Sequence, residues 1–114
     1  MSGCIFCRII GGDIPSDTIY ENETVKVFKD INPVAPIHLI IVPKEHIDDI
    51  NALDETNAHV VAECMLAVKK AADIMSISDS GYRVISNCGE DAGQSVQHLH
   101  FHLVGGIAMG ERIL

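Results

Sequence analysis

The chain contains no tryptophan, and aromatic residues make up only 4% of its 114 residues. Aliphatic side chains must therefore supply most of its core. Basic residues are also scarce, because 8 Lys and Arg against 16 Asp and Glu give a formal net charge of −8. A charge of that sign excludes nucleic acid as the main partner, since the phosphate backbone is bound by a basic stripe. It does not exclude a small nucleotide held by backbone N–H groups.

Long apolar runs are absent as well. No stretch approaches the roughly 20 apolar residues of a membrane span, and the start of the chain, MSGCIFCRII, lacks the apolar run of a secretory signal. We therefore expect a cytoplasmic protein without a membrane partner. The length predicts a single domain, residues 1–114. In a reducing compartment, the four cysteines are not expected to form a disulfide framework.

Hydrophobic patterning predicts an α+β fold with an antiparallel sheet. A repeat of apolar residues every three or four positions predicts one long helix over residues 55–75, with Asp54 as its N-cap. Residues 5–10 are expected to form a short helical turn. About five strands are predicted, among them a hairpin and a buried central strand, at residues 18–21, 25–29, 38–43, 82–87 and 97–104.

Three of the six histidines, His98, His100 and His102, stand at alternate positions near the end of the chain. Period 2 is the side-chain period of a strand, so the three imidazoles are expected on one face. The intervening residues, Leu99, Phe101 and Leu103, would face the long helix. Three imidazoles in a row serve no packing purpose, because they repel when charged and need partners when buried.

Three interpretations of this histidine strand can be compared. The first is a solvent-facing strand whose polar positions happen to be histidine. The second is a three-histidine metal site, as in zinc hydrolases. A strand would separate the outer two histidines by roughly 13 Å, which is too far for one ion. The third is catalysis, in which one histidine attacks phosphorus, a neighbour orients it and another binds the anionic substrate.

The heptad HLHFHLV at residues 98–104 resembles the H-φ-H-φ-H-φ-φ signature of the histidine triad nucleotide-binding superfamily. Residues 4–47 resemble the N-terminal half of that family almost continuously, and residues 87–106 resemble its active-site half. The likeness is greatest to the Hint-type nucleoside phosphoramidases. The third histidine supports this branch, because the galactose-1-phosphate uridylyltransferase branch has Gln at that position.

The resemblance implies a histidine-triad-like fold, a two-fold dimer, and hydrolysis of purine nucleoside phosphoramidates. The P–N bond would be cleaved to an AMP-type product through a nucleotide covalently bound to histidine. The nucleophile would be His100, with its tautomer held by the backbone carbonyl of His98. His102 would stabilise charge on the phosphate, His38 would stand beside the triad, and Ser95 would assist the leaving amine.

The resemblance also implies a substrate-binding set. Asp30 and Ile31 match the ribose and base site, and Asn87 matches a residue near the phosphate and leaving group. The loop containing Gly93, Gln94 and Ser95 would cradle phosphate oxygens beside His100 and His102. From the residues alone, Asp30 as the start of a loop, Asn87 as a turn residue and His38 as a solvent-facing strand end remain open alternatives.

Cys4 and Cys7 form a C-x-x-C pair, a spacing typical of metal or redox sites. Together with His46 and His98 they make a sound tetrahedral zinc set. Some members of the superfamily, mainly bacterial, resemble this chain at these positions. The resemblance implies a structural Zn²⁺ that pins the N-terminal segment to the strand at His98. The alternative is a pair of reduced thiols without metal.

Two further functions remain open. One is a dinucleoside polyphosphate hydrolase of the fragile-histidine-triad type, and the other is a non-enzymatic nucleotide-binding zinc adaptor. A homodimer is expected because the long helix and residues 82–87 resemble the two-fold interface of the family. The residues after Gly106, IAMGERIL, carry no Trp, unlike the C-terminal segment of many Hint-type proteins, so the leaving-group preference is not predicted.

Overall fold

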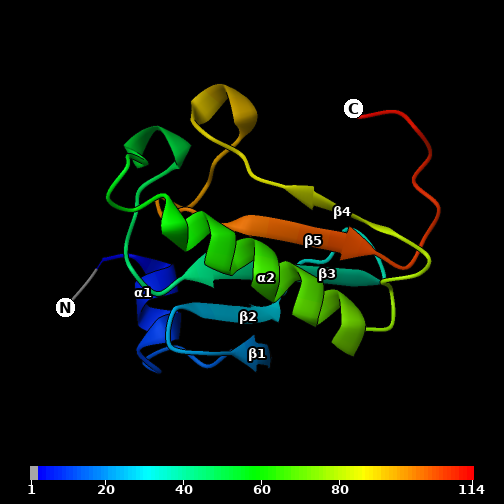
Figure 1. Cartoon of the computed structure of the whole chain (residues 1–114), viewed down its shortest axis with the longest axis horizontal. Coiled ribbons are helices and arrows are strands. Elements are labelled where there is room, and N and C mark those ends of the chain that lie inside the picture. Colours follow the sequence, from blue (N-terminus) through cyan, green and yellow to red (C-terminus); the bar gives the residue numbers. More distant parts are fainter. Residues whose placement is uncertain (1–2) are drawn as a thin grey trace.

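The computed structural model describes residues 3–114 and confirms the α+β fold (Figure 1). Residues 1 and 2 of the predicted domain lie outside the described part. Short 3-10 turns at Ile50–Ala52 and Glu90–Ala92 lie in the connecting loops. The main elements are, in chain order, α1 (Ile5–Ile10), β1 (Thr18–Glu21), β2 (Val25–Lys29), β3 (Ile37–Pro43), α2 (His59–Ile74), β4 (Tyr82–Ile85) and β5 (Phe101–Gly105).

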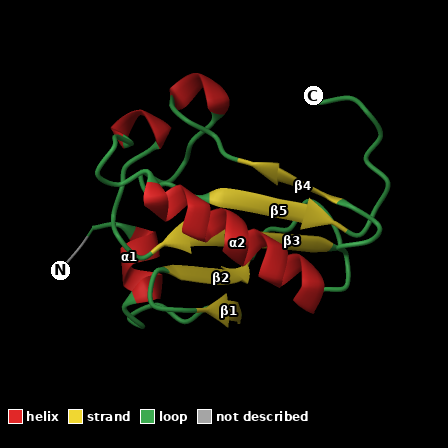
Figure 2. Cartoon of the chain, in the orientation of Figure 1, coloured by secondary structure: helices red, strands yellow, loops and turns green. Residues whose placement is uncertain are grey.

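The five strands form the predicted antiparallel sheet, in the order β1-β2-β3-β5-β4 (Figure 2). The two strands that carry His38 and His102 are neighbours at its centre. In their register Ile40 lies opposite His102, and Leu39 lies opposite Leu103. Because successive side chains point to opposite faces, Leu39 and Leu103 share one face, and Ile40 and His102 share the other.

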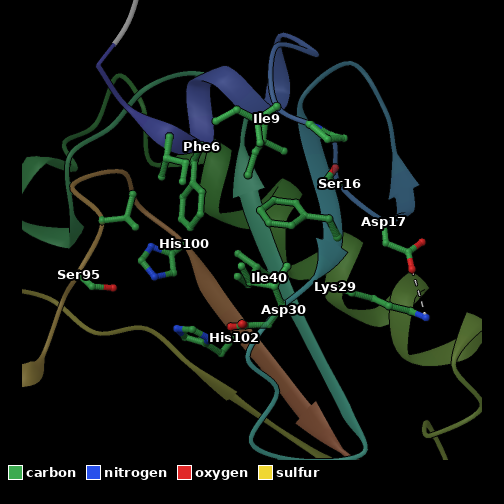
Figure 3. Close-up of a pocket in the computed structure, with 16 residues that line it drawn as sticks. Phe6, Ile9, Ser16, Asp17, Lys29, Asp30, Ile40, Ser95, His100 and His102 are labelled. Atoms are coloured by element: carbon green, nitrogen blue, oxygen red, sulfur yellow. Dashed lines mark ion pairs between the residues drawn. The ribbon is translucent and has the colours of Figure 1, made fainter.

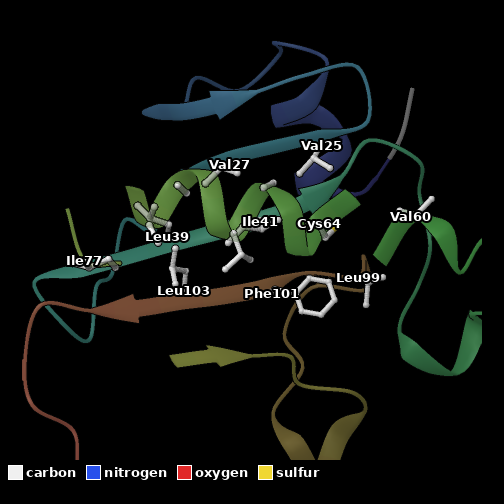
Figure 4. Close-up of a cluster of buried hydrophobic side chains, with 14 of the residues drawn as sticks. Val25, Val27, Leu39, Ile41, Val60, Cys64, Ile77, Leu99, Phe101 and Leu103 are labelled. Carbon is white, nitrogen blue, oxygen red and sulfur yellow. The ribbon is translucent and has the colours of Figure 1, made fainter. Parts of the chain in front are cut away.

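Each face of the sheet packs against one helix. The long helix α2 covers the face of Leu39, Ile41 and Leu103, where Leu99 and Phe101 also join the main buried cluster, as predicted (Figure 4). On the opposite face, α1 packs through Phe6 and Ile9 against side chains of β2 and β3, namely Phe28, Ile40 and Val42. The histidines therefore share their face of the sheet with α1. Within residues 3–114, no helix has both the length and the apolar character to cross a membrane.

The long helix starts later than predicted. It begins at His59, after an Ala58 N-cap that makes no side-chain capping bond. Asp54 does not cap it, because the Asp54 carboxylate accepts the backbone N–H and the hydroxyl of Thr56, at 2.8 and 2.6 Å. Such a local bond competes with helix formation, so residues 55–58 form turns. The predicted range 55–75 was wrong over its first turn.

The histidine strand is shorter than predicted, because β5 begins at Phe101 and not at residue 97. The last pair between β3 and β5 joins Ile41 to Phe101. Beyond it, Pro43 has no N–H to donate, and its carbonyl accepts Nε2–H of His98 at 2.8 Å. His98 and His100 therefore lie in an irregular segment that precedes the strand. Similarly, β4 ends at Ile85, two residues before its predicted end.

Candidate active site and metal centre

His100 is buried, with 5% of its surface exposed, and its ring is held in one orientation. Its Nδ1 lies 2.8 Å from the backbone carbonyl oxygen of His98. A carbonyl only accepts hydrogen bonds, so Nδ1 carries the proton and, in the neutral ring, Nε2 is bare. The hydroxyl of Ser86 donates to the carbonyl of His100 at 2.8 Å and fixes the backbone as well. A bare, oriented imidazole nitrogen can act as a nucleophile.

Phe6 contacts this ring from α1, a position in the site that was not predicted from the sequence. Its ring centroid lies 5.0 Å from that of His100 and 6.0 Å from that of His98, both edge-to-face. Phe6 also packs edge-to-face on Phe28 at 5.7 Å. The one signal that could have placed α1 over the triad was the expected link between the C-x-x-C pair and His98.

His102 and His38 meet across the two central strands. His38 Nε2 lies 2.9 Å from His102 Nδ1 and 3.3 Å from a carboxylate oxygen of Asp30. Burial lowers the pKa of His102, the nearby His100 and His38 lower it further, and Asp30 opposes them. His102 is therefore favoured as a neutral ring. The structure thus brings together His38, His102 and Asp30, which were predicted as separate site residues.

A cavity of about 500 Å³ opens beside these rings, large enough for a small ligand (Figure 3). Ser95, His100 and His102 line it together with Asp30, whose carboxylate lies beside His102, and Ile31 is also among its lining residues. At another part of its wall, Asp17 and Lys29 form an ion pair with an N–O distance of 3.4 Å. The remaining wall is mostly apolar and comes from both helix α1 and the sheet, including Phe6, Ile9, Phe28 and Ile40.

The other predicted loop residues are not among the described residues that line this cavity. The Gln94 side chain accepts the N–H of Gly89 and donates to the carbonyls of Asp48 and Val96, so it braces the loop. The Gly93 N–H donates to Glu90, and the Gln94 N–H to Gly89. Asn87 is half-buried beyond the end of β4. Their contact with phosphate stays a prediction.

Four side chains converge beside the triad as a candidate metal centre: Cys4, Cys7, His46 and His98. One ligand atom from each lies within 4.8 Å of all the others. The Nδ1 atoms of His46 and His98 are 3.1 Å apart, and Cys7 Sγ lies 3.2 and 3.5 Å from them. A tetrahedral zinc ion with Zn–N and Zn–S bonds of about 2.0 and 2.3 Å separates its ligands by roughly 3.3–3.8 Å. The spacing of the four atoms fits that geometry closely.

The hydrogen bonds of the two histidines fit a cation as well. His98 donates Nε2–H to the carbonyl of Pro43, and His46 Nε2 lies 2.8 Å from a carboxylate oxygen of Asp48. Metal-bound histidines make this kind of second bond to a carbonyl or carboxylate. It leaves both Nδ1 lone pairs facing one another, and burial lowers the pKa of His98, which keeps that ring neutral. A cation between them removes the repulsion.

His98 joins the two sites. Its Nδ1 faces the thiols, at 3.4 Å from Cys4 Sγ, whereas its backbone carbonyl accepts the proton of His100 Nδ1. The predicted face of three histidines is therefore divided: one ring belongs to the candidate metal centre, and the other two belong to the cavity.

Known proteins resemble this chain over almost its whole length. Residues 3–112 match the family model "Scavenger mRNA decapping enzyme C-term binding". A HIT family hydrolase from Clostridium thermocellum is 47% identical, with a TM-score of 0.98 over 100% of this chain and 99% of that one. A histidine triad protein from Clostridium difficile is 39% identical, with a TM-score of 0.94 over 98% and 97% of the two chains.

A relative from Escherichia coli K12, named purine nucleoside phosphoramidase, is 37% identical over 106 residues, which are 93% of this chain and 89% of that protein. These matches extend over nearly the whole molecule and include the histidine heptad. The chain belongs to the histidine triad (HIT) family, as its heptad at residues 98–104 predicted.

Proposed function

We propose that this protein hydrolyses the P–N bond of purine nucleoside phosphoramidates and releases an AMP-type nucleotide and an amine. One observation carries the proposal: the proton of the buried His100 ring is committed to the His98 carbonyl, which leaves its Nε2 free beside a nucleotide-sized cavity. The name of the Escherichia coli relative supports the same bond type.

The reaction would take two steps at one phosphorus. His100 Nε2 attacks the α-phosphorus, the P–N bond breaks, and the amine leaves with a proton that the Ser95 hydroxyl relays from solvent. The nucleotidyl group is then bonded to His100. Water attacks the same phosphorus and gives up a proton to solvent, the bond to His100 breaks, and the nucleotide departs with the neutral ring restored. The N–H of His102 would stabilise the charge that builds on the phosphoryl oxygens.

The cavity suggests how the nucleotide is held by an acidic protein. Its apolar wall of Phe6, Ile9 and Phe28 suits the flat purine base, and the Asp30 carboxylate suits the ribose hydroxyls. Ile31 is 91% exposed at the rim, where it would be covered by the base or ribose. Asn87, Gly93 and Gln94 would complete the site from the loop side, next to the phosphate and the leaving group.

We further propose that Cys4, Cys7, His46 and His98 hold a structural Zn²⁺. The ion would tie α1 to the segment that orients His100 and would take no part in bond cleavage. Because thiolates must stay reduced to bind metal, the site suits the cytoplasm. A homodimer formed through α2 and β4 is also proposed, because both elements expose large apolar side chains, including Leu66 and Ile85.

The function is tested by comparing kcat/KM for an adenosine phosphoramidate and for diadenosine triphosphate. Faster turnover of the phosphoramidate is expected. Faster turnover of the triphosphate would indicate a dinucleoside polyphosphate hydrolase, and negligible turnover of both would indicate a nucleotide-binding adaptor. Either result would contradict the proposal.

The nucleophile is tested with His100→Ala. Loss of a nucleophile costs about a millionfold in kcat where the side chain acts covalently, so turnover should become undetectable. AMP binding, measured by calorimetry, should change only a few-fold. His59→Ala is the matched control, because His59 is an exposed histidine on α2, outside the cavity. Mass spectrometry of wild-type enzyme denatured at alkaline pH, where the P–N bond to histidine survives, should find the nucleotidyl group on His100. Retained activity in His100→Ala would refute the mechanism.

A further inference from the structure

The hydrogen bond between Val34 and His38 has a fixed donor and acceptor, and it has no part in the proposed mechanism. The backbone N–H of Val34 points at Nδ1 of His38, with an N–N distance of 3.1 Å. A backbone amide can only donate, so His38 Nδ1 must accept and carries no proton. The neutral ring of His38 therefore has its proton on Nε2.

That proton determines the state of the next ring. His38 Nε2 lies 2.9 Å from Nδ1 of His102, close enough for one proton between the two nitrogens and too close for two. Since His38 supplies it, His102 Nδ1 accepts and stays bare. The remaining proton of a neutral His102 must then sit on its own Nε2, the other end of the ring. His102 lines the cavity next to His100.

We propose that the Val34 amide and His38 are positioning groups that keep His102 Nδ1 unprotonated and present its Nε2–H to the cavity. That the N–H meets a phosphoryl oxygen rests on the proposed function, whereas the protonation pattern does not. The two neighbouring rings are thus set to opposite tautomers by two backbone groups. The carbonyl of His98 makes His100 an acceptor at Nε2, and the amide of Val34 makes His102 a donor at Nε2.

The hydrogen bond from the Val34 N–H also shows how the cluster around His38 differs chemically from the candidate metal centre. Asp30, His38 and His102 also bring ligand atoms within 4.8 Å of one another. A histidine that ligates a metal usually donates its other ring proton to an acceptor. His38 instead receives a donor at its other nitrogen, so binding a cation through Nε2 would leave its second proton facing the Val34 N–H. The cluster is thus built to pass on a hydrogen-bond direction, and it is poorly suited to a metal.

The test is the protonation state of the rings in the free protein, read at neutral pH from long-range ¹H–¹⁵N correlations of histidine. His38 and His102 should both be Nε2–H, and His100 should be Nδ1–H. The groups that face His102 are His38 from β3, His100 from the segment before β5, and Asp30 after β2. Finding Nδ1–H on neutral His102 in the wild-type protein would overturn the proposal.

Two variants interrupt this series of hydrogen bonds at different points. Val34→Pro removes the N–H, and Val34→Ala is its matched control, because it keeps the N–H and shortens only an exposed side chain. His38→Asn keeps an oxygen that can accept the Val34 N–H but does not reach His102. In Val34→Pro and His38→Asn, His102 Nδ1 becomes free to take a proton. The pKa of His102 should rise by about one unit, and Val34→Ala should titrate like wild type.

A purely structural role for His38 would leave this titration unchanged. If Val34→Pro does not fold, as judged by its amide spectrum, His38→Asn still decides. Wild-type titration of His102 in His38→Asn would refute the proposal. On a phosphoramidate substrate, His38→Asn should lower kcat about tenfold and change KM less, because the donor is needed most as charge develops. Absence of phosphoramidate turnover in the wild type would refute the proposed function alone and leave the ring pattern standing.

Discussion

At the scale of single residues, the backbone around the nucleophile matters as much as the rings. His100 lies outside the regular ladder of β5, so no strand pairing fixes its carbonyl. The hydroxyl of Ser86, just after β4, replaces that pairing with a bond of 2.8 Å. The nucleophile is therefore held from two sides: its ring by His98 and its carbonyl by Ser86.

We predict that Ser86→Ala lowers the free energy of unfolding by about 1 kcal/mol, because it leaves a partly buried carbonyl without its donor. The same change should lower kcat several-fold, because the backbone that carries the nucleophile is less well fixed. Urea unfolding and steady-state kinetics measure the two effects. Ser80→Ala is a suitable control, since its hydroxyl lies 3.5 Å from the Ile77 carbonyl and forms at best a weak bond. Wild-type stability and kcat in Ser86→Ala would show that the bond has no role.

At the scale of elements, α1 depends on what holds its ends. It has six residues, well below the roughly 12–15 that an isolated helix needs to be even marginally stable. Phe6 and Ile9 bury its inner side, and Cys4 and Cys7 bring its start to the candidate metal centre. We therefore expect the cover of α1 over the triad to depend on both attachments.

We predict that Cys7→Ser, or removal of zinc by a chelator, lowers Tm by about 10 °C, which corresponds to about 2 kcal/mol for a domain of this size. Amide hydrogen exchange should accelerate most over residues 5–10, which shows that the helix loosens. Metal analysis of the purified wild type should find about one zinc per chain. Cys88→Ser is the control, because Cys88 lies in a loop outside the cluster. If wild-type protein produced in zinc-containing medium contains no zinc, the proposed metal centre is contradicted.

The bounds of helices and strands were predicted correctly where the sequence pattern that sets them lies within the element. The hairpin at 18–21 and 25–29 has its predicted bounds, because strand alternation and a turn signal lie within a few residues. The start of α2 was misplaced because Asp54 has the chemistry of a cap but uses it on Thr56. The histidine strand was predicted too long because its period 2 continues through residue 98, and the cause of its end, Pro43, lies on another strand.

The residues of the candidate site likewise include some that the sequence predicted and some that it did not. His38, His100 and His102 follow from the heptad and the resemblance, since their chemistry depends on residue type. Phe6 and Val34 did not follow from the sequence. Phe6 reaches the triad through the packing of α1, and Val34 acts through a backbone N–H that every residue except proline carries.

At the scale of the whole molecule, one face of the sheet forms most of the buried core and the other carries the candidate site. The face under α2 is filled by aliphatic side chains, including Val27, Leu39 and Ile41, and supplies most of the buried core. The opposite face carries the cavity, the rings and the candidate metal centre beside the smaller α1. Substitutions in the first core should therefore mainly change stability, whereas substitutions of the polar cavity residues on the second face should mainly change binding and turnover.

The outer surface of α2 and the edge strand β4 each leave large apolar side chains in water. Leu66 is 64% exposed on α2, and Ile85 is 37% exposed on β4, whose outer edge has no partner strand among residues 3–114. Exposed large apolar side chains and an open sheet edge are both typical of self-association surfaces. In a two-fold dimer each of these residues occurs in the interface twice, once from each protomer. One charged substitution therefore buries two charges of the same sign.

We therefore predict that the wild type sediments as a dimer, and that Leu66→Glu and Ile85→Lys each shift it to a monomer by analytical ultracentrifugation. Val34→Lys is the matched control, since Val34 is 76% exposed in the loop between β2 and β3, outside both elements, and it should stay dimeric. A wild type that sediments as a monomer at micromolar concentration would refute the dimer. If both single variants stay dimeric, α2 and β4 are not the interface.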